Sequence, residues 1–331
     1  MLTRVELIEK YSKGVQLRGD IQTLFTRESV AFHGKTSFAM STLSCEDIQF
    51  LRGLKKGLLL ENVSSLRSWK LLALLESRAA LKYLSPVDEN RQVEWLSYFH
   101  SAPQTLQNEI GEKTVMLVGC GGTGAIIATH LARAGVNHFV LIDPAVVDAP
   151  DLNRQLNYFP EDLGIKKVDA LAVDLRRLRP NVTVRSIPFA VEGVEDLRKW
   201  IREARPNLVI NCADKPLGLI HAWVAEASRE LEVPVLFGGV GLGDASVGPL
   251  LLDSSSKRVY EAAMTRAHAA FSAAEQPLKA SLCFTNSWAS VMIAFEAFKY
   301  LTGIGEIKTL NRSVVVDFFE QSTKVEAQWC S

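Results

Sequence analysis

Residues 114–124 read TVMLVGCGGTG, a run of apolar residues that ends in a glycine-rich turn. The apolar residues 114–118 predict a buried strand, and residues 125–134 predict the helix that follows. A glycine turn between a strand and a helix is the setting in which a GxGxxG pattern indicates nucleotide binding, although such a turn can also be purely structural.

The glycines of this turn have distinct expected roles. Gly119 permits the tight turn, Gly121 lets phosphates approach the backbone, and Gly124 allows close packing of strand and helix. The first N–H groups of the helix have no partner within it and carry a partial positive charge, which favours a phosphate. The turn predicts a nucleotide site, but it does not distinguish ATP from NAD.

From residue 114 onward, apolar runs alternate with amphipathic stretches, which is typical of βα units and a parallel sheet. Strands are expected over residues 138–143, 182–189, 207–212 and 233–238, helices over 167–178, 194–202, 217–230 and 286–301, and a terminal strand pair over 313–319 and 323–329. Residues 253–283 predict a mobile or partly helical crossover segment. The expected fold class is α/β, with a Rossmann-like sheet.

The first part of the chain has a different pattern. Residues 20–26 and 30–33 predict short strands, Ser44 opens a capping-box sequence, and residues 65–84 predict a second helix. Two or three strands and about three helices predict a small winged-helix-like module. We therefore expect this module over residues 1–86 and a catalytic domain over 87–331, with 87–113 as the connection.

Composition excludes several classes of protein. The 331 residues hold 37 Lys and Arg and 37 Asp and Glu, so no overall field attracts nucleic acid or an anionic membrane. The N-terminus lacks an apolar signal core, and no run of about 18 uncharged apolar residues occurs, which predicts a cytoplasmic protein. Five cysteines without a CxxC pair, and histidines without an HExxH pattern, argue against disulfides and zinc.

Asp143 ends the strand expected after the glycine turn, 19 residues beyond Gly124. A carboxylate there can accept hydrogen bonds from both ribose hydroxyls of either ATP or NAD. The alternative is an ordinary aspartate in a turn at a strand end.

Two cations follow where a triphosphate would extend, and they do not suit a dehydrogenase. Arg154 can fork two hydrogen bonds to phosphate oxygens, and Lys167 at the start of the next helix acts as a point charge. Both would offset the charge that develops when a phosphoanhydride breaks. Lys166 is the adjacent alternative to Lys167, and each cation taken alone is also typical of a solvated surface.

Asp214 follows another expected strand at the same carboxyl edge, where open α/β sheets bind ligands. A carboxylate among phosphates is costly unless it holds a divalent cation, so Asp214 is the candidate Mg²⁺ ligand. The alternative is a helix N-cap before Leu217.

The string over residues 114–155 resembles the signature of the ubiquitin-activating-enzyme-like (ThiF) superfamily. The resemblance implies an adenylation domain that binds ATP and Mg²⁺ and activates a carboxylate as its acyl-adenylate. It implies nucleotide-site roles for Gly119, Gly121, Gly122, Gly124, Asp143, Arg154, Gln155, Lys167 and Asp214. Family members act as dimers, and Arg91 resembles the arginine that reaches the partner subunit's ATP.

The segments CADKP (212–216) and FGGVGLGDASVGPLL (237–251) favour the branch of this family that matures ribosomal peptides. Residues 14–33 and the helix after Ser44 resemble a leader-peptide recognition element, which adds a peptide as a strand to a sheet edge. The implied partners are a precursor peptide and a second copy of the chain. An unrelated winged-helix or dimerisation module remains the alternative.

Some positions depart from the family pattern. The zinc-binding CxxC pairs are absent, Ala145 stands where a second Asp is frequent, and Asp151 stands where Asn is common. Cys283 lies near the crossover segment, but no basic neighbour would lower its pKa, so a thioester step is not expected.

The sequence leaves several alternatives open. The carboxylate is either a peptide C-terminus or a glutamate side chain, and activation proceeds by adenylation or by phosphorylation. Two rival functions are a Rossmann NAD(P)-dependent oxidoreductase and a nucleotide-holding protein that delivers peptide to another enzyme.

Overall fold

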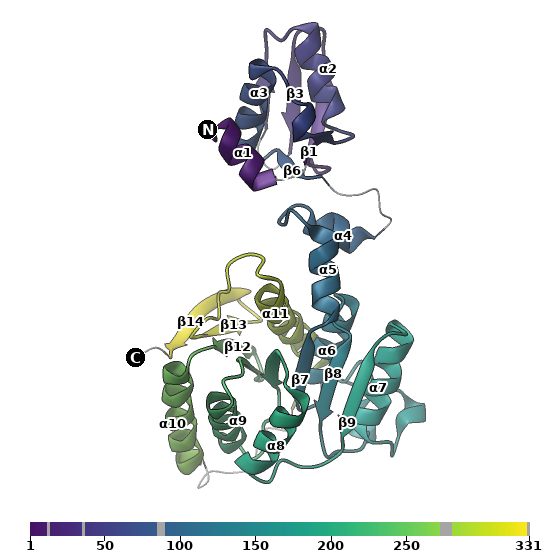
Figure 1. Cartoon of the computed structure of the whole chain (residues 1–331). Helices are drawn as coiled ribbons and strands as arrows, with labels where there is room; N and C mark the ends of the chain where they lie inside the picture. Colours follow the sequence, from purple (N-terminus) through teal and green to yellow (C-terminus); the bar gives the residue numbers. More distant parts are fainter. Residues whose placement is uncertain (12–13, 35–36, 85–89, 272–279, 330–331) are drawn as a thin grey trace. The chain divides into compact units, whose positions relative to one another are not determined.

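The computed structural model describes residues 1–11, 14–34, 37–84, 90–271 and 280–329. By its internal contacts the chain divides into two units, Met1–Gln107 and Asn108–Ser331 (Figure 1). The domain boundary expected between residues 86 and 87 falls outside the described ranges.

The first unit contains two small antiparallel sheets, with strand orders β5-β1-β6 and β2-β3-β4, and helices that share one apolar core with them. Val15, Phe32, Leu51 and Leu72 are fully buried in this core. The elements are α1 (Arg4–Tyr11), β1 (Gly14–Leu17), β2 (Gln22–Phe25), β3 (Val30–His33), β4 (Phe38–Met40), α2 (Cys45–Gly53), β5 (Leu58–Leu59), a 3-10 turn (Leu60–Asn62), α3 (Leu66–Ser77), β6 (Leu81–Tyr83), α4 (Arg91–Leu96) and α5 (Pro103–Gly111), which crosses into the second unit.

The expected capping box is confirmed. Ser44 Oγ accepts a hydrogen bond from Asp47 N at 3.2 Å, and Asp47 Oδ2 accepts one from Ser44 N at 2.8 Å. Arg67 on α3 forms an ion pair with the same carboxylate at 2.6 Å. The hydrogen bonds and the ion pair hold the pKa of Asp47 below its usual range.

The helix expected over residues 65–84 is wrong in its second half. α3 ends at Ser77, Ala79 adopts the left-handed conformation with φ +52°, and residues 81–83 form strand β6. Leu81 pairs with Leu17 of β1 and is 5% exposed. Pairing with a strand more than sixty residues earlier in the chain overrides the local helical pattern here.

The second unit is an α/β sandwich around an eight-stranded sheet in the order β14-β13-β12-β11-β10-β7-β8-β9. Its strands are β7 (Thr114–Val118), β8 (His138–Ile142), β9 (Thr183–Ile187), β10 (Leu208–Asn211), β11 (Val235–Val240), β12 (Asp244–Leu251), β13 (Arg312–Asp317) and β14 (Ser322–Gln328). Its helices are α6 (Gly124–Arg133), α7 (Lys167–Leu178), α8 (Val194–Ala204), α9 (Leu219–Glu230), α10 (Ser254–Phe271) and α11 (Cys283–Thr302), with 3-10 turns at Ala149–Asp151 and Pro160–Asp162.

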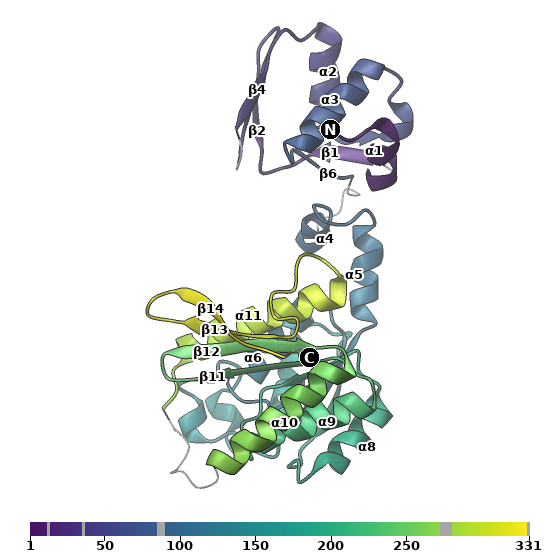
Figure 2. The same ribbon diagram turned by 90° about the vertical axis from the view of Figure 1, so that its left-hand side faces the viewer.

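Five neighbouring strands, from β11 to β9, are parallel, and β12 to β14 continue the sheet antiparallel. Helices α6, α7 and α11 cover one face, and α8, α9 and α10 cover the other (Figures 1 and 2). The chain runs from β7 outward through β8 and β9 and then returns to β10 on the other side of β7. This switch point opens the carboxyl ends of β7 and β10 to a ligand.

One strand of this unit differs from expectation, and the partly helical character expected for residues 253–283 is confirmed. Strand β12 was not predicted, because its segment contains Gly248 and Pro249, which normally weaken a strand. The segment 253–283 is helical from Ser254 to Phe271, and Asp253 caps this helix by accepting a hydrogen bond from Ser256 N at 2.8 Å. Residues 272–279 of the segment lie outside the described ranges.

Across the residues that the structure describes, no helix combines the length and apolarity needed to cross a membrane.

Candidate active site

The glycine turn joins β7 to α6 beside the switch point. Gly119 has φ +93°, and a Cβ there would lie 2.7 Å from the backbone N of Ala213. A Cβ on Gly124 would lie 2.0 Å from the carbonyl oxygen of Gly119. Gly121, in contrast, has no described atom within 4 Å of an added Cβ. The turn is tightly packed at its ends and open at Gly121, where a ligand has room to approach.

Helix α11 closes one side of the turn. A Cβ on Gly122 would come within 3.1 Å of the Asn286 side chain, which is 5% exposed. Ser290 Oγ, one helical turn further along, lies 3.1 Å from the Thr123 carbonyl oxygen. A side chain at position 122 would therefore displace the Asn286 side chain by a few tenths of an ångström, and no sequence motif marks Asn286 as part of the site.

Asp143 follows β8 and is half-buried. Its Oδ2 accepts a hydrogen bond from Cys120 N at 2.7 Å, and its Oδ1 accepts one from Ala145 N at 2.8 Å. A carboxylate has about four lone-pair sites, so two remain for the ribose hydroxyls predicted from the sequence. The side chain therefore fixes the glycine turn and still has capacity for a ligand.

The side chains of Arg154, Gln155 and Lys167 meet at one carboxylate, that of Asp151. Lys167 Nζ lies 2.9 Å from its Oδ2, and Arg154 Nη2 lies 3.1 Å from its Oδ1. Gln155 donates a hydrogen bond from Nε2 to Oδ1. The Oε1 atom of Gln155 is buried and has no hydrogen-bond partner in the described part of the chain. The sequence placed these groups along one chain segment, and the fold brings them to one point.

Burial distinguishes Lys167 from its neighbour Lys166. Lys167 is 8% exposed and Asp151 is 6% exposed, so their ion pair is largely removed from water. Lys166 is half-buried, and its Nζ donates a hydrogen bond to the Pro144 carbonyl at 2.8 Å. The lysine that joins the cluster is therefore Lys167.

Tyr158 connects this cluster to the glycine turn. Its buried hydroxyl donates a hydrogen bond to the Cys120 carbonyl, and the Lys167 ammonium lies 5.9 Å from the centre of its ring. Burial, with nearby Cys120 and acidic groups, raises the pKa of Tyr158 well above its usual value, so the phenol remains a donor. No sequence motif marks this tyrosine.

Asp214 lies in the loop after β10, exposed beside the glycine turn. Cys212 N in this loop donates to the Val118 carbonyl at 2.8 Å, which ties the loop to the end of β7. Asn211 is fully buried, and its Oδ1 has no hydrogen-bond partner among the described residues. The N-cap alternative for Asp214 is wrong, because α9 begins at Leu219 and its N-cap is Gly218.

Comparison with known protein families assigns this chain to a family. A model of the ThiF family matches residues 90–328. The chain belongs to the ThiF family. Among curated proteins it is similar to the ubiquitin-like modifier-activating enzyme 5 of Bombyx mori, 28% identical over 228 residues, which cover 64% of this chain and 56% of that protein. The same enzyme of Aedes aegypti is 28% identical over 234 residues, with 63% and 56% covered. The chain thus spans a little over half the length of these relatives.

Solved structures match over nearly the whole chain. The E. coli MccB structure with ATP has a TM-score of 0.75 at 18% identity and covers 96% of this chain and 98% of its own. The structure of PaaA has a TM-score of 0.70 at 18% identity, covering 95% and 100%. At this identity the likeness shows the fold, and it agrees with the α/β architecture expected from the sequence.

Arg91 belongs to the first unit. It is the first residue of α4 and is exposed. Asn90 caps this helix by accepting a hydrogen bond from Gln92 N at 3.0 Å. The segment is therefore helical, and the Arg91 side chain is accessible to a partner.

His221, in the first turn of α9, was not singled out from the sequence. Its Nδ1 lies 2.9 Å from the Tyr260 hydroxyl, and its ring stacks on Phe237 with centroids 5.4 Å apart. Burial lowers the pKa of His221 to about 4, against a smaller opposing effect of the Asp214 charge. The imidazole is therefore neutral at pH 7 and contributes no positive charge near Asp214.

The residues at the carboxyl ends of β7 and β10 could bind Mg²⁺ only together with oxygen atoms of a bound substrate. In the described ranges no group of three His, Cys, Asp or Glu residues is arranged to hold a metal ion. Mg²⁺ is commonly held by one or two carboxylates together with substrate phosphates, a mode that an exposed Asp214 fits. The two nearby thiols do not suit a nucleophilic role, since burial raises the pKa of Cys212 to about 12 and that of Cys120 well above its usual value.

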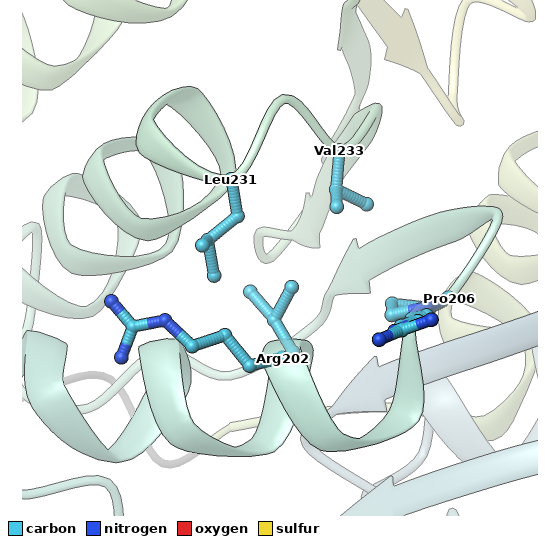
Figure 3. Close-up of a pocket in the computed structure, with 6 residues that line it drawn as sticks. Arg202, Pro206, Leu231 and Val233 are labelled. Atoms are coloured by element: carbon cyan, nitrogen blue, oxygen red, sulfur yellow. The ribbon is translucent and has the colours of Figure 1, made fainter.

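A surface hollow of about 450 Å³ lies elsewhere, at the amino ends of β10 and β11 (Figure 3). It is lined by Ile201, Arg202, Arg205, Pro206, Leu231 and Val233. None of the predicted site residues contributes to it, so the candidate site is the strand-end cluster and not this hollow.

Proposed function

We propose that this chain is an ATP- and Mg²⁺-dependent enzyme that activates a carboxylate of a ribosomally made precursor peptide. The observation that carries the proposal is the convergence of Lys167, Arg154 and Gln155 on Asp151, close to a glycine turn that is open at Gly121. A dehydrogenase has no need of two cations in this position. Structures of MccB with ATP and with the MccA peptide support the same combination of nucleotide and peptide.

In the proposed reaction a carboxylate oxygen attacks the α-phosphorus of ATP, and pyrophosphate leaves with the electrons of the broken bond. Lys167 and Arg154 offset the charge that shifts onto the phosphate oxygens. A Mg²⁺ ion held by Asp214 and phosphate oxygens would neutralise the same charge. An amide nitrogen or another nucleophile then displaces AMP. The carboxylate is a peptide C-terminus or a glutamate side chain.

The first unit is proposed to bind the leader of the precursor peptide as an added strand. β4 is an edge strand that pairs only with β3 among the described strands, so one of its backbone edges is available. On β4, half-buried Phe38 stacks on the buried Phe32 with centroids 4.5 Å apart, and exposed Arg78 lies 5.7 Å from the Phe38 ring. Phe38 and Arg78 would form one wall for a leader side chain.

A homodimer is proposed on the basis of α11. Phe284, Trp288, Val291 and Phe295 recur at helical spacing and are 75%, 40%, 45% and 50% exposed. An apolar stripe of this kind on a helix is typical of a subunit interface. In such a dimer Arg91 would act at the partner subunit's ATP. ATP and newly made peptides meet in the cytoplasm, where we expect the reaction.

The deciding experiment measures ATP consumption and pyrophosphate release by the full chain, with and without the precursor peptide encoded beside it. We expect turnover only with the peptide, and its loss in Lys167→Ala and Asp214→Ala. Turnover that these two substitutions leave unchanged would contradict the proposal. NAD(P) binding without any ATP turnover would favour an oxidoreductase, and ATP binding without turnover a delivery protein.

The peptide role has separate tests. Mass spectrometry of the co-expressed precursor reports the bond that is formed. A truncated chain that begins near Val87 should lose most of its affinity for the leader, and undiminished affinity would contradict the proposed leader site.

A further inference from the structure

Asp151 is the centre of the strand-end cluster, although the sequence marks it only as a departure from the family pattern. Its Oδ1 accepts from Arg154 Nη2 at 3.1 Å and from Gln155 Nε2. Its Oδ2 lies 2.9 Å from Lys167 Nζ and accepts from Asp148 N at 3.1 Å. Four donors fill the roughly four lone-pair sites of a carboxylate, so Asp151 has no capacity left for a metal ion.

The backbone of this segment is organised by the same residue. The N–H groups of Arg154 and Gln155 donate to the Asp151 carbonyl at 3.1 and 2.9 Å. The Asp151 carbonyl thus fixes the backbone of Arg154 and Gln155, and the Asp151 carboxylate fixes the ends of their side chains. Lys167 reaches the cluster from a different element, the start of α7.

Charge explains why a carboxylate suits this position. Lys167 and Arg154 are two like charges held near each other, and Lys167 is 8% exposed. Without an anion they would repel each other, and the buried ammonium would lack compensation. One carboxylate keeps both side chains in place and leaves the cluster with a net positive charge for a polyanion.

We propose that Asp151 is a positioning residue, which holds Lys167 and Arg154 in the arrangement that receives the nucleotide phosphates. This inference rests on the proposed function, because it assumes that the cluster binds ATP. Asp151 acts through the two cations and does not itself contact the nucleotide.

The proposal predicts that the effect of Asp151→Asn on ATP affinity is opposite in the natural chain and in a Lys167→Met variant. In the natural chain, Asp151→Asn releases the cations from their positions and weakens ATP binding. In a Lys167→Met background, Asp151 has lost its buried cation and repels the phosphates. The same Asp151→Asn change should then strengthen ATP binding. A residue with a purely structural role would lower the melting temperature in both backgrounds and would not reverse its effect on affinity.

The test is calorimetric titration of ATP in the presence of Mg²⁺ into the full chain and its variants. We expect affinity to fall roughly 10-fold in Asp151→Asn, and to rise at least about 3-fold when Asp151→Asn is added to Lys167→Met, which lies within the range of coupling between contacting residues. Glu161→Gln is the control. Glu161 is an exposed carboxylate in the next 3-10 turn, Pro160–Asp162, so its loss should change affinity by less than about 2-fold.

Two results would overturn the positioning role: an Asp151→Asn variant that binds ATP as tightly as the natural chain, or a double variant that binds more weakly than Lys167→Met. Natural chain that binds no ATP would instead refute the proposed function, and with it this role, before any variant is compared. If Asp151→Asn does not fold, the comparison of Lys167→Met with the double variant still decides, because the double variant removes the buried ion pair as a whole.

Discussion

The loops after β8 and β10 lie at the same edge of the sheet, but the carboxylates of Asp151 and Asp214 in these loops differ in burial and in hydrogen bonding. After β8, Asp151 is 6% exposed and accepts four donors from the protein. After β10, Asp214 is exposed and forms no hydrogen bond or ion pair with any residue in the described ranges. A satisfied buried carboxylate orders its neighbours, whereas an exposed one keeps its lone pairs for a ligand. The comparison separates scaffold charges from ligand-facing charges within one site.

The largest effect that sharpens this comparison is expected at Asp214. Asp214→Asn should lower peptide-dependent ATP turnover by about 10²- to 10³-fold, because the Mg²⁺-bound phosphates lose their protein ligand. Since the side chain is exposed and forms no hydrogen bond or ion pair with the part of the chain that the structure describes, thermal denaturation should show an unchanged melting temperature. Glu192→Ala, at another exposed carboxylate, serves as the control and should affect neither quantity. A large loss of stability in Asp214→Asn would break the distinction between the loops.

Lys167→Met should behave in the opposite way and reduce stability as well as turnover. Removing one partner of a buried ion pair leaves the other charge uncompensated, which typically costs about 3–5 kcal/mol; Arg154 still contacts Asp151, so the lower end is expected. Chemical denaturation measures the free energy of unfolding. Lys166→Met is the matched control, with a cost of about 1 kcal/mol because half-buried Lys166 loses one hydrogen bond, to the Pro144 carbonyl.

Two substitutions in the glycine turn, Gly124→Ala and Gly121→Ala, form a matched pair with a smaller expected effect on stability. Gly124→Ala should destabilise by about 1–3 kcal/mol, since its Cβ would lie 2.0 Å from a backbone oxygen. Gly121→Ala has open space and should leave unfolding nearly unchanged while it weakens ATP binding. Equal stability losses in the two variants would contradict the open space at Gly121, and unchanged ATP affinity in Gly121→Ala would contradict the approach of a ligand there.

The smallest effect concerns His221 in the region after β10. Its folded pKa of about 4 lies below the usual 6.5, so the unfolded chain binds more protons between these values. Stability is therefore fully present above about pH 6.5 and is lost as the pH falls towards 4. We expect a loss of about 1–2 kcal/mol, less than the full shift implies because the ring is partly exposed. His221→Gln should flatten this part of the stability profile, and an unchanged slope would contradict the assignment.

Local sequence was a good guide where an element has strong periodicity of its own. β7 and α7 begin and end at the residues expected, and the glycine turn lies between β7 and α6. It is a poor guide at β6, where the local pattern predicts the end of a helix, and at β12, which the local pattern does not predict. β6 is defined by its distant partner β1, which no local pattern contains, whereas β12 pairs with the adjacent β11 and distant β13 and includes Gly248 and Pro249, which normally weaken a strand.

The sequence by itself determined the glycine turn, the α/β class and the resemblance to the ThiF family, and it named the polar residues of the strand ends. Only the tertiary structure decided that Lys167, Arg154 and Gln155 share Asp151, that Tyr158 ties them to the turn, and that α11 closes against Gly122. The physical reason is that a residue's type follows from the sequence, whereas its partners follow from how the sheet brings separate loops to one edge.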